Sequence, residues 1–499
     1  MQLMSNGVVA TPSRLPGRLL HRIATLILMV FAVVVSVDPA NCEENPNDGR
    51  VPNVILILVD DLGWSDLPCY GNNFHETPHI DRLARQGMRF QDFYAAPVCS
   101  PARASIQSGQ YTARVGITNF IPGHWRPFAK LIEAPNGPFL PLACVTIAEA
   151  LKQAGYTTGH FGKWHLGPHS HFPDKQGYDV SVVTGGRHFG SRVLGKPPKK
   201  LPPEVYLADF LTDRAVEFIE QNRDRPFFVH LAHYAVHIPL EAKAAEIRKY
   251  VEKPKPPGGV NNPVYAAMIA HVDQSVGRVM KTLEQLQLAD NTVFIFTSDN
   301  GGLRRRYDGQ GEVVTTNAPL RDEKGSLYEG GIRVPLVVRW PGVVAPDSVC
   351  REPVTCADFY PTLVEVAGGK PPAAQVLDGL SLVPLLKQAG GFQREAVYFH
   401  YPHYHHTRPA GAIRAGDWKL IEFFDDETLE LYNLKDDLGE QNDLIGKLPQ
   451  LARQLHGRLE AWRKSVGAKM PTENPKHDPQ RAGQWWSRRT KKPLNLRKN

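Results

Sequence analysis

The unbroken apolar run of residues 54–59 constrains the fold of this chain most, because it ends directly in two carboxylates, Asp60 and Asp61. Apolar residues at every position, without polar alternation, are typical of a central parallel strand that is covered on both faces. Residues 226–232 and 291–298 form two further strand candidates. The sequence therefore predicts an α/β domain with a large, mixed but mostly parallel sheet and helices on both faces.

Polar residues follow two of these predicted strands. Asp60 and Asp61 follow the first, and Asp299 and Asn300 follow the run of residues 291–298. Ligands of open α/β sheets gather at the carboxyl ends of the strands, so we expect these side chains to project into a crevice there. Adjacent carboxylates repel each other unless a cation or a proton relieves the repulsion. The alternative is that a carboxylate only caps the turn after its strand.

The N-terminal residues predict a secretory signal. Basic residues at positions 14, 18 and 22 precede the apolar run of residues 23–37, which is shorter than the about 20 residues that a membrane span needs. We therefore expect an exported protein, periplasmic or secreted, with a signal peptide and short linker over residues 1–42. Contact with the membrane would be transient. The cleavage position cannot be read from the sequence, and an uncleaved anchor is the alternative.

Composition agrees with a globular exported protein. The length of 499 residues suits a large α/β domain with a smaller appendage. Hydrophobic residues make up 42% and charged residues 22% of the chain, which is ordinary globular usage and argues against disorder throughout. The formal charge is only +7, and part of it lies near the two ends. For an exported chain, a polyanionic substrate is a more natural partner than nucleic acid.

Cys99 lies where a predicted strand gives way to a helix. Pro101 suits the first turn of that helix, and Arg103, four positions after Cys99, returns to the same face. A cation beside a thiol at the positive end of a helix can lower the pKa of the thiol, which would make Cys99 an activated nucleophile. A buried cysteine without a chemical role is the alternative.

The remaining cysteines give only weak predictions. Setting Cys99 aside leaves an odd number of the six cysteines, so at least one of the others stays unpaired. Cys350 and Cys356 are close enough in sequence to form a disulfide, although sequence cannot show the spacing of their Cα atoms.

Basic side chains occur near three further strand ends and loops. One predicted strand delivers Lys163 and His165 to the same face, since residues i and i+2 of an extended segment share a face. His237 lies just beyond the second predicted strand, and Lys324 lies on a glycine-bounded loop. Any one of these could also be an ordinary surface or structural residue.

The C-terminal part has a different pattern. From about residue 394 the sequence predicts short antiparallel strands, followed by a helix over residues 448–465. We therefore expect a catalytic domain over residues 51–393, a small antiparallel sheet with a helix over residues 394–470, and a basic tail over residues 471–499. Trp485 and Trp486 in the tail are expected to pack on the body of the protein, and contact with a sugar is the alternative.

The segment Cys99-Ser-Pro-Ala-Arg103 resembles the signature of the type I sulfatases, in which this cysteine is oxidised after translation to formylglycine. The other clusters stand in that family's order over roughly residues 51–443, although Val236 precedes His237 where many relatives carry proline. The resemblance implies an alkaline-phosphatase-like fold. It assigns catalytic roles to Cys99, Arg103, Lys163, His165, His237 and Lys324, and metal ligation to Asp60, Asp61, Cys99, Asp299 and Asn300.

The resemblance also implies calcium as the cofactor, with magnesium possible, because most of the assigned ligands offer hard oxygen atoms. In the implied mechanism, one hydroxyl of the hydrated aldehyde at Cys99 attacks sulfur while Lys163 and Lys324 hold the sulfate oxygens. His237 assists the leaving oxygen, and His165 removes the proton from the second hydroxyl. A formylglycine-generating maturase would be required during biogenesis.

Sulfated carbohydrate ranks above a small aryl sulfate ester as the expected substrate, from export and from the habits of the family. His403, His405 and Arg408 are predicted to contact the sugar, and an exposed loop with packed tyrosines is the alternative. Three other functions stay open: a phosphate or phosphonate monoester hydrolase of the same superfamily, a non-catalytic protein that binds sulfated glycans, and a hydrolase with Cys99 itself as the nucleophile.

Overall fold

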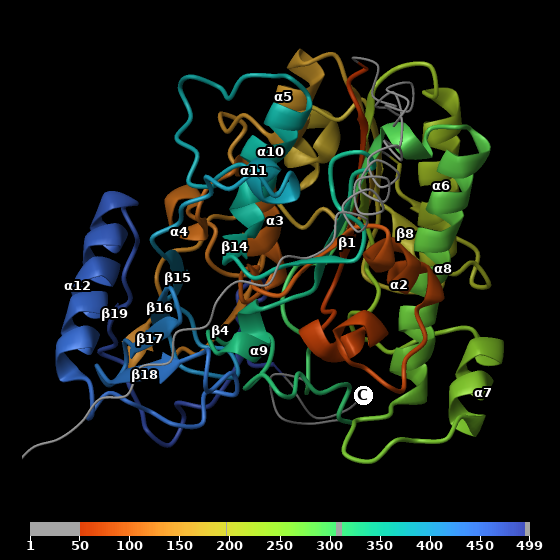
Figure 1. Cartoon of the computed structure of the whole chain (residues 1–499). Coiled ribbons are helices and arrows are strands. Elements are labelled where there is room, and N and C mark those ends of the chain that lie inside the picture. Colours follow the sequence, from red (N-terminus) through yellow and green to blue (C-terminus); the bar gives the residue numbers. More distant parts are fainter. Residues whose placement is uncertain (1–49, 196, 306–311, 495–499) are drawn as a thin grey trace, which may run out of the picture. The chain divides into compact units, whose positions relative to one another are not determined.

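A computed structural model describes residues 50–195, 197–305 and 312–494 of the chain (Figure 1). The predicted signal segment and Cys42 lie outside the described residues. Within the part of the chain that is described, no helix combines the length and the apolar character that a membrane span requires.

An eight-stranded sheet forms the centre of the large domain, in the order β13-β2-β12-β11-β1-β10-β6-β7. β1 pairs in parallel with β10 on one side and with β11 on the other, and all three strands are buried along their whole length. β12 runs antiparallel to both of its neighbours, β11 and β2. The predicted mixed, mostly parallel sheet is therefore confirmed. Its strands are β1 Asn53–Val59, β2 Met88–Phe90, β6 Thr157–Gly162, β7 Val180–Val183, β10 Phe227–Ala232, β11 Thr292–Ser298, β12 Leu336–Arg339 and β13 Ser348–Cys350.

Helices cover both faces of this sheet, which explains why the central strands are apolar at every position. Leu56 packs in one hydrophobic cluster with α3, α5 and α10, whereas Ile57 packs in a second cluster with α2, α6 and α8. Figure 1 shows these two helix groups on opposite sides of β1. The helices are α2 Pro78–Arg85, α3 Cys99–Ser108, α4 Thr112–Val115, α5 Ile147–Gln153, α6 Leu207–Gln221, α7 Ala244–Glu252, α8 Pro263–Gln285, α9 Glu329–Ile332, α10 Phe359–Val366, α11 Val383–Leu386 and α12 Pro449–Ser465. Short 3-10 helices span Trp64–Asp66, Pro68–Tyr70, His169–His171, Pro173–Lys175, Ala289–Asn291 and Cys356–Asp358.

The predicted antiparallel sheet and its helix are present in the C-terminal part. The sheet contains β15 Val397–Tyr401, β16 Ala410–Ala415, β17 Trp418–Phe423 and β18 Leu429–Asn433, and α12 packs against it. Lys419 of β17 is fully buried and lies 2.8 Å from carboxylate oxygens of both Glu329 and Glu440. This buried ion cluster joins the small sheet to α9.

The tail returns to the large domain through short strands. β19 Thr472–Glu473 pairs with β5 Leu131–Ile132, and β20 Trp486–Ser487 pairs with β4 His124–Trp125. Trp485 is 6% exposed and packs in a cluster with Leu131 and Tyr404, so its predicted packing on the body is confirmed. The other short pairs are β3 Phe93–Tyr94 with β14 Val354–Thr355, and β8 Arg192–Val193 with β9 Lys199–Lys200.

The structure does not form the disulfide that the sequence allowed. Cys350 and Cys356 both carry free thiols, and so do Cys69, Cys99 and Cys144. Cys350 belongs to β13 in the large sheet, whereas Cys356 follows β14, which pairs with β3. Cys350 therefore lies in the large sheet and Cys356 in a 3-10 helix, despite their closeness in sequence.

Candidate active site

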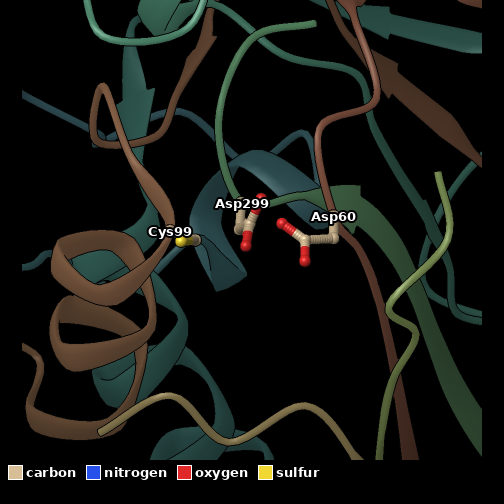
Figure 2. A group of neighbouring side chains, drawn as sticks. All are labelled: Asp60, Cys99 and Asp299. Atoms are coloured by element: carbon tan, nitrogen blue, oxygen red, sulfur yellow. The ribbon is translucent and has the colours of Figure 1, made fainter. Parts of the chain in front are cut away.

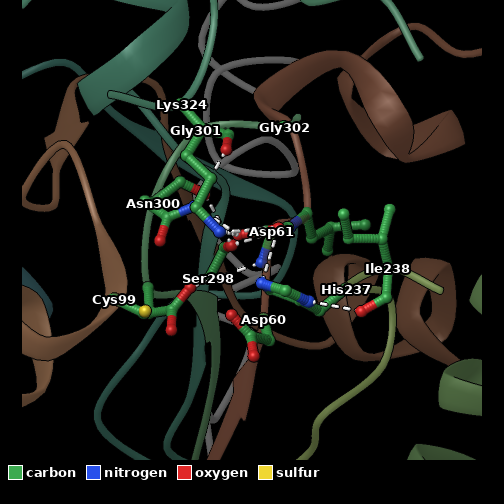
Figure 3. A network of polar contacts seen from close by, with 12 residues as sticks. Asp60, Asp61, Cys99, His237, Ile238, Ser298, Asn300, Gly301, Gly302 and Lys324 are labelled. Carbon is green, nitrogen blue, oxygen red and sulfur yellow. Dashed lines mark hydrogen bonds and ion pairs between the residues drawn. The ribbon is translucent and has the colours of Figure 1, made fainter. Parts of the chain in front are cut away.

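Two parallel strands bring the predicted ligand residues to one edge of the sheet. β1 and β11 pair along their whole length, so the residues that follow them lie at the same level. Asp60, Asp61, Asp299 and Asn300 are all at most 1% exposed. The Nδ2 group of Asn300 donates to Oδ1 of Asp61 over 2.7 Å (Figure 3). The strand ends thus gather three carboxylates and one amide in a buried crevice.

Cys99 faces this crevice from the first turn of α3. Its Sγ atom and carboxylate oxygens of Asp60 and Asp299 lie within 4.8 Å of one another (Figure 2). Burial raises the pKa of the Cys99 thiol, although Lys163 and Lys324 act in the opposite direction. The thiol therefore stays protonated near neutral pH. This result argues against the alternative in which an activated thiolate is the nucleophile.

Arg103 lies on the same helix as Cys99 and bonds to both the Asp299 carboxylate and the backbone of Lys163. Its Nε and Nη2 groups donate to Oδ2 of Asp299 over 2.9 and 2.6 Å, and its Nη1 group donates to the Lys163 carbonyl over 2.6 Å. Burial and the neighbouring Asp60 carboxylate raise the pKa of Asp299 to about 6. For Asp60 itself burial also opposes ionisation, but the Lys163 ammonium and other nearby cations hold its pKa well below the usual range.

Two oxygens in the crevice have no hydrogen-bond donor. Oδ1 of Asp60 and Oδ1 of Asn300 are buried and lack a partner among the described residues. An unsatisfied buried acceptor is costly, and most buried polar atoms in proteins are paired. Both atoms belong to residues predicted to bind a metal ion, and carboxylate and amide oxygens are the ligands that Ca²⁺ and Mg²⁺ prefer. These oxygen ligands therefore fit a hard divalent cation.

Lys163 and His165 reach the crevice from beyond β6 rather than from within it. The expected strand through His165 is not formed, because β6 ends at Gly162. Gly162 has a φ of +124° and His165 has a φ of +58°, neither of which an extended strand adopts, and a Cβ atom at Gly162 would lie 1.8 Å from the Ala232 carbonyl oxygen. The Lys163 ammonium contacts the Asp60 carboxylate.

The ring of His165 points at Cys99. Its Nδ1 atom lies 3.2 Å from Cys99 Sγ, and its Nε2 atom lies 2.5 Å from the Ile121 carbonyl oxygen. Because a carbonyl can only accept, Nε2 carries the proton and the Nδ1 lone pair faces residue 99. Burial, followed by the charges of Lys163 and Arg103, places the pKa of His165 well below its ordinary value. His165 is therefore a neutral base at physiological pH.

Lys324 and His237 complete the basic side chains. The Nζ atom of Lys324 lies 2.6 Å from Oδ1 of Asp61. The Nδ1 group of His237 donates to the Ile238 carbonyl over 2.6 Å, and its Nε2 atom lies 3.6 Å from Oδ2 of Asp61 (Figure 3). Burial and the charge of Lys324 lower the pKa of His237 to about 4.

Sequence reasoning missed Tyr234, which organises this side of the site. Its hydroxyl donates to the Ile238 carbonyl over 2.6 Å and lies 3.0 Å from Nδ1 of His237. The Lys163 ammonium lies 5.6 Å from the centre of its ring. The available signal was an aromatic residue two positions after a buried strand and three positions before His237.

A cavity of about 500 Å³ opens over these groups. Cys99, Lys163, His165, His237 and Lys324 all line it. The rest of its described lining is largely apolar and aromatic and includes Phe120, Trp164, Phe172, Leu194, Tyr234 and Leu303. The cavity has room for an organic group beside the polar cluster.

The three residues predicted to contact the sugar lie in different environments. His405 lines the cavity. His403 is fully buried, where its ring lies 2.8 Å from Thr118 Oγ1, and Arg408 forms an ion pair with Asp426. Neither His403 nor Arg408 is among the described residues that line the cavity. The role of all three residues stays a prediction.

Comparison with known proteins assigns the family. Residues 52–369 match the family model described as Sulfatase. The chain belongs to the sulfatase family. A second match, to the family described as N-sulphoglucosamine sulphohydrolase, C-terminal, covers residues 322–465 and so includes the small antiparallel sheet and α12. This sulfatase is 33% identical to a protein named Sulfatase from Formosa agariphila, over 87% of this chain and 93% of that protein. It is 34% identical to human N-acetylgalactosamine-6-sulfatase, over 70% and 68% of the two chains.

Solved structures agree with this assignment. The crystal structure of Ps i-CgsB in complex with k-i-k-neocarrahexaose is 29% identical in sequence, with a TM-score of 0.70 over 86% of this sulfatase and 96% of that chain. The phosphonate monoester hydrolase of Agrobacterium radiobacter is 20% identical, with a TM-score of 0.63 over 83% and 96%, and so shares the fold. The protein is a sulfatase enzyme with the alkaline-phosphatase-like fold that the sequence predicts.

Proposed function

We propose that this sulfatase is exported and removes sulfate from sulfated carbohydrate, with a formylglycine made from Cys99 and a bound divalent cation, calcium in the first place. The observation that carries the proposal is the convergence of Cys99 Sγ with the Asp60 and Asp299 carboxylates within 4.8 Å, where Cys99 also lines the cavity. A residue placed there can contact both a cation held by the carboxylates and a sulfate ester that enters the cavity.

The raised pKa of the Cys99 thiol argues against direct thiolate chemistry at this residue. As a hydrated aldehyde, the side chain would supply one hydroxyl to attack sulfur and a second that allows sulfate to be expelled without a separate hydrolysis step. The neutral ring of His165, with its Nδ1 lone pair 3.2 Å from Sγ, is placed to accept a proton from residue 99.

Asp60, Asp61, Asp299 and Asn300 would hold the cation, through oxygens that include the two unsatisfied acceptors. The cation would supply charge stabilisation at the sulfate and would lower the pKa of a hydroxyl bound to it. Arg103 keeps the Asp299 carboxylate in place with its two hydrogen bonds.

Lys163 and Lys324 are the groups that would bind the sulfate oxygens. Burial alone would lower the pKa of each ammonium, but Asp60 raises that of Lys163 and Asp61 raises that of Lys324, so both stay charged at neutral pH. Two largely buried cations can offset the charge that grows on the sulfate oxygens in the transition state. Lys324, with His237 beside it, is placed to stabilise or protonate the leaving oxygen.

Carbohydrate is the proposed substrate class because the names or titles of several similar proteins include a carbohydrate. These include human N-acetylgalactosamine-6-sulfatase and the Ps i-CgsB complex with k-i-k-neocarrahexaose. Export is proposed from the basic and apolar pattern of the N-terminal residues. A formylglycine-generating maturase is then the partner required during biogenesis.

The test is a desulfation screen with enzyme co-expressed with a formylglycine-generating maturase. Release of sulfate from sulfated sugars, at a rate well above hydrolysis of aryl phosphate and phosphonate esters, is the expected result. Mass spectrometry of the Cys99 peptide should show the aldehyde. The Cys99→Ala variant should be inactive, whereas Cys144→Ala, at a half-buried cysteine outside the described lining of the cavity, should retain activity. Full activity with an unmodified Cys99 would overturn the proposal.

A further inference from the structure

A second cavity of about 650 Å³ adjoins the active-site cavity. The two share Gly186 and Leu194 in their linings. Whereas the first cavity has largely apolar walls, the described lining of the second includes three cations, Arg187, Arg192 and Lys200. We call this second cavity the basic groove. A substrate that extends over Gly186 and Leu194 would pass from one cavity into the other.

The cations of the basic groove have no ion-pair partner among the described residues. Arg187, Arg192 and Lys200 are exposed, and no ion pair joins any of them to an acidic side chain within the described part of the chain. Glu241 also lines the groove, but its carboxylate accepts the backbone N–H of His188 over 3.2 Å. Among the described lining residues, positive charge is therefore in excess over the Glu241 carboxylate.

The hairpin of β8 and β9 places two of these cations directly opposite each other. Arg192 pairs with Lys200 in the antiparallel register, so their side chains lie on the same face. Like charges in directly opposite positions destabilise a two-stranded ribbon. An anion bound between the two side chains would remove this repulsion, which is a physical reason to expect a ligand here.

The segment that carries the groove is also attached to the active site. A Cβ atom at Gly186 would lie 3.0 Å from the ring and the hydroxyl of Tyr234, so the backbone packs closely against that residue. The Nε2 group of His188 donates to the His237 carbonyl over 2.8 Å. Because Tyr234 and His237 both line the active-site cavity, the basic groove has a fixed position relative to it.

We propose that the basic groove binds a second anionic group, a sulfate or a carboxylate, on a sugar next to the one that is desulfated. The inference rests on the proposed function and deepens it: the substrate is an oligosaccharide with at least two anionic groups. Arg187, Arg192 and Lys200 act in binding this substrate and take no part in the reaction at sulfur.

The test compares one probe that carries several anionic groups with two probes that carry a single anionic group. In the triple variant Arg187→Gln, Arg192→Gln, Lys200→Gln, binding of a labelled heparin-derived tetrasaccharide should weaken about tenfold, a loss of about 1.4 kcal/mol. Binding of glucosamine 6-sulfate and turnover of p-nitrophenyl sulfate should change less than about twofold. The salt dependence of tetrasaccharide binding should become less steep, because fewer charged contacts are made.

Arg225→Gln serves as the control, since Arg225 is exposed just before the amino end of β10, away from the carboxyl ends that form the site. It should leave all these measurements unchanged. Equal tetrasaccharide affinity in the triple variant and the wild type would overturn the inference, and so would a parallel loss of p-nitrophenyl sulfate turnover. Weakened tetrasaccharide binding in an enzyme that desulfates no substrate would instead support the basic groove and contradict the proposed function.

Discussion

Arg103 donates two hydrogen bonds to a single carboxylate oxygen of Asp299, over 2.9 and 2.6 Å. Both side chains are at most 2% exposed, so the pair lies in a region from which water is largely excluded. Removing one partner of a buried pair leaves an uncompensated charge, which typically costs about 3–5 kcal/mol. The pair therefore contributes to the position of Asp299 and to the stability of the protein.

Replacing Arg103 by Lys should separate the effect of its positive charge on activity from the effect of its hydrogen-bond geometry. Lysine keeps the positive charge but lacks the planar fork, so Asp299 loses its paired donors and kcat/KM for an aryl sulfate should fall about 10²-fold or more. Arg114 makes a similar two-bond contact with Asp378, at 2.8 Å for each bond, and is absent from the described lining of the cavity. Arg114→Lys should leave kcat/KM within about twofold. Similar activity in both variants would contradict a role for Arg103 geometry.

Calcium should stabilise the folded protein through the two unsatisfied oxygens of Asp60 and Asn300. A ligand that binds only the native state at 100 times its Kd adds about 2.7 kcal/mol to the free energy of unfolding. We expect Ca²⁺ to raise the Tm of the wild type, chelation to reverse the effect, and Asn300→Leu to lose most of it. Asp224→Asn, at an exposed carboxylate, should respond like the wild type. Equal Ca²⁺ responses in the wild type and Asn300→Leu would place the ion elsewhere.

Gly325 should be intolerant of a side chain because of its contact with His405. It has a φ of +84°, and a Cβ atom there would lie 1.9 Å from Nδ1 of the His405 ring. Gly325→Ala should displace the neighbouring Lys324, lower kcat/KM at least about tenfold, and lower the Tm. Gly416 also has a positive φ, of +58°, but a Cβ atom there would meet nothing within 4 Å beyond its chain neighbours. Gly416→Ala should therefore cost only about 1 kcal/mol of backbone strain.

The comparison with Gly416→Ala decides whether the effect of Gly325→Ala comes from the contact with His405. If Gly416→Ala and Gly325→Ala lower the Tm equally and neither affects kcat/KM, the contact with His405 has no influence on Lys324. Combining Gly325→Ala with His405→Ala removes the ring from the contact. The double variant should therefore recover part of the Tm that the single variant loses.

The sequence allowed the framework of the site to be predicted because strand burial and strand ends are local signals. The runs that became β1 and β11 are apolar throughout, and the polar residues Asp60 and Asp299 follow them directly. Parallel pairing then brings those residues to the same edge of the sheet. The signature at Cys99 also predicted membership of the sulfatase family, which the comparisons confirm.

Features that depend on long-range contacts could not be predicted in this way. β19 and β20 have only two residues each, too few to show a strand periodicity, and they are defined by pairing with distant segments. The environments of Lys419 and His403 depend on acidic partners far away in the sequence. The expected strand through His165 is absent because Gly162 and His165 have φ values of +124° and +58°, which an extended strand does not adopt.

Asp273 should make stability depend on pH. It lies on α8, and its Oδ1 atom accepts the backbone N–H groups of His79 and Ile80 at the start of α2, over 2.9 and 2.8 Å. Burial raises its pKa from the ordinary 3.8 to about 7, despite these hydrogen bonds. Between these two values the folded state binds more protons at Asp273 than the unfolded state does, so the contribution of Asp273 to stability falls as the pH rises.

Asp273→Asn keeps an oxygen acceptor for α2 but cannot ionise. The Tm of the variant minus that of the wild type should therefore increase between pH 5 and pH 8, because only the wild type must bury a charged carboxylate at the higher pH. Groups that titrate in both proteins cancel in this difference. Asp224→Asn should give a difference that does not change with pH, since Asp224 is exposed. If the difference for Asp273→Asn is also constant, Asp273 ionises at its ordinary pKa, and the hydrogen bonds from α2 outweigh its burial.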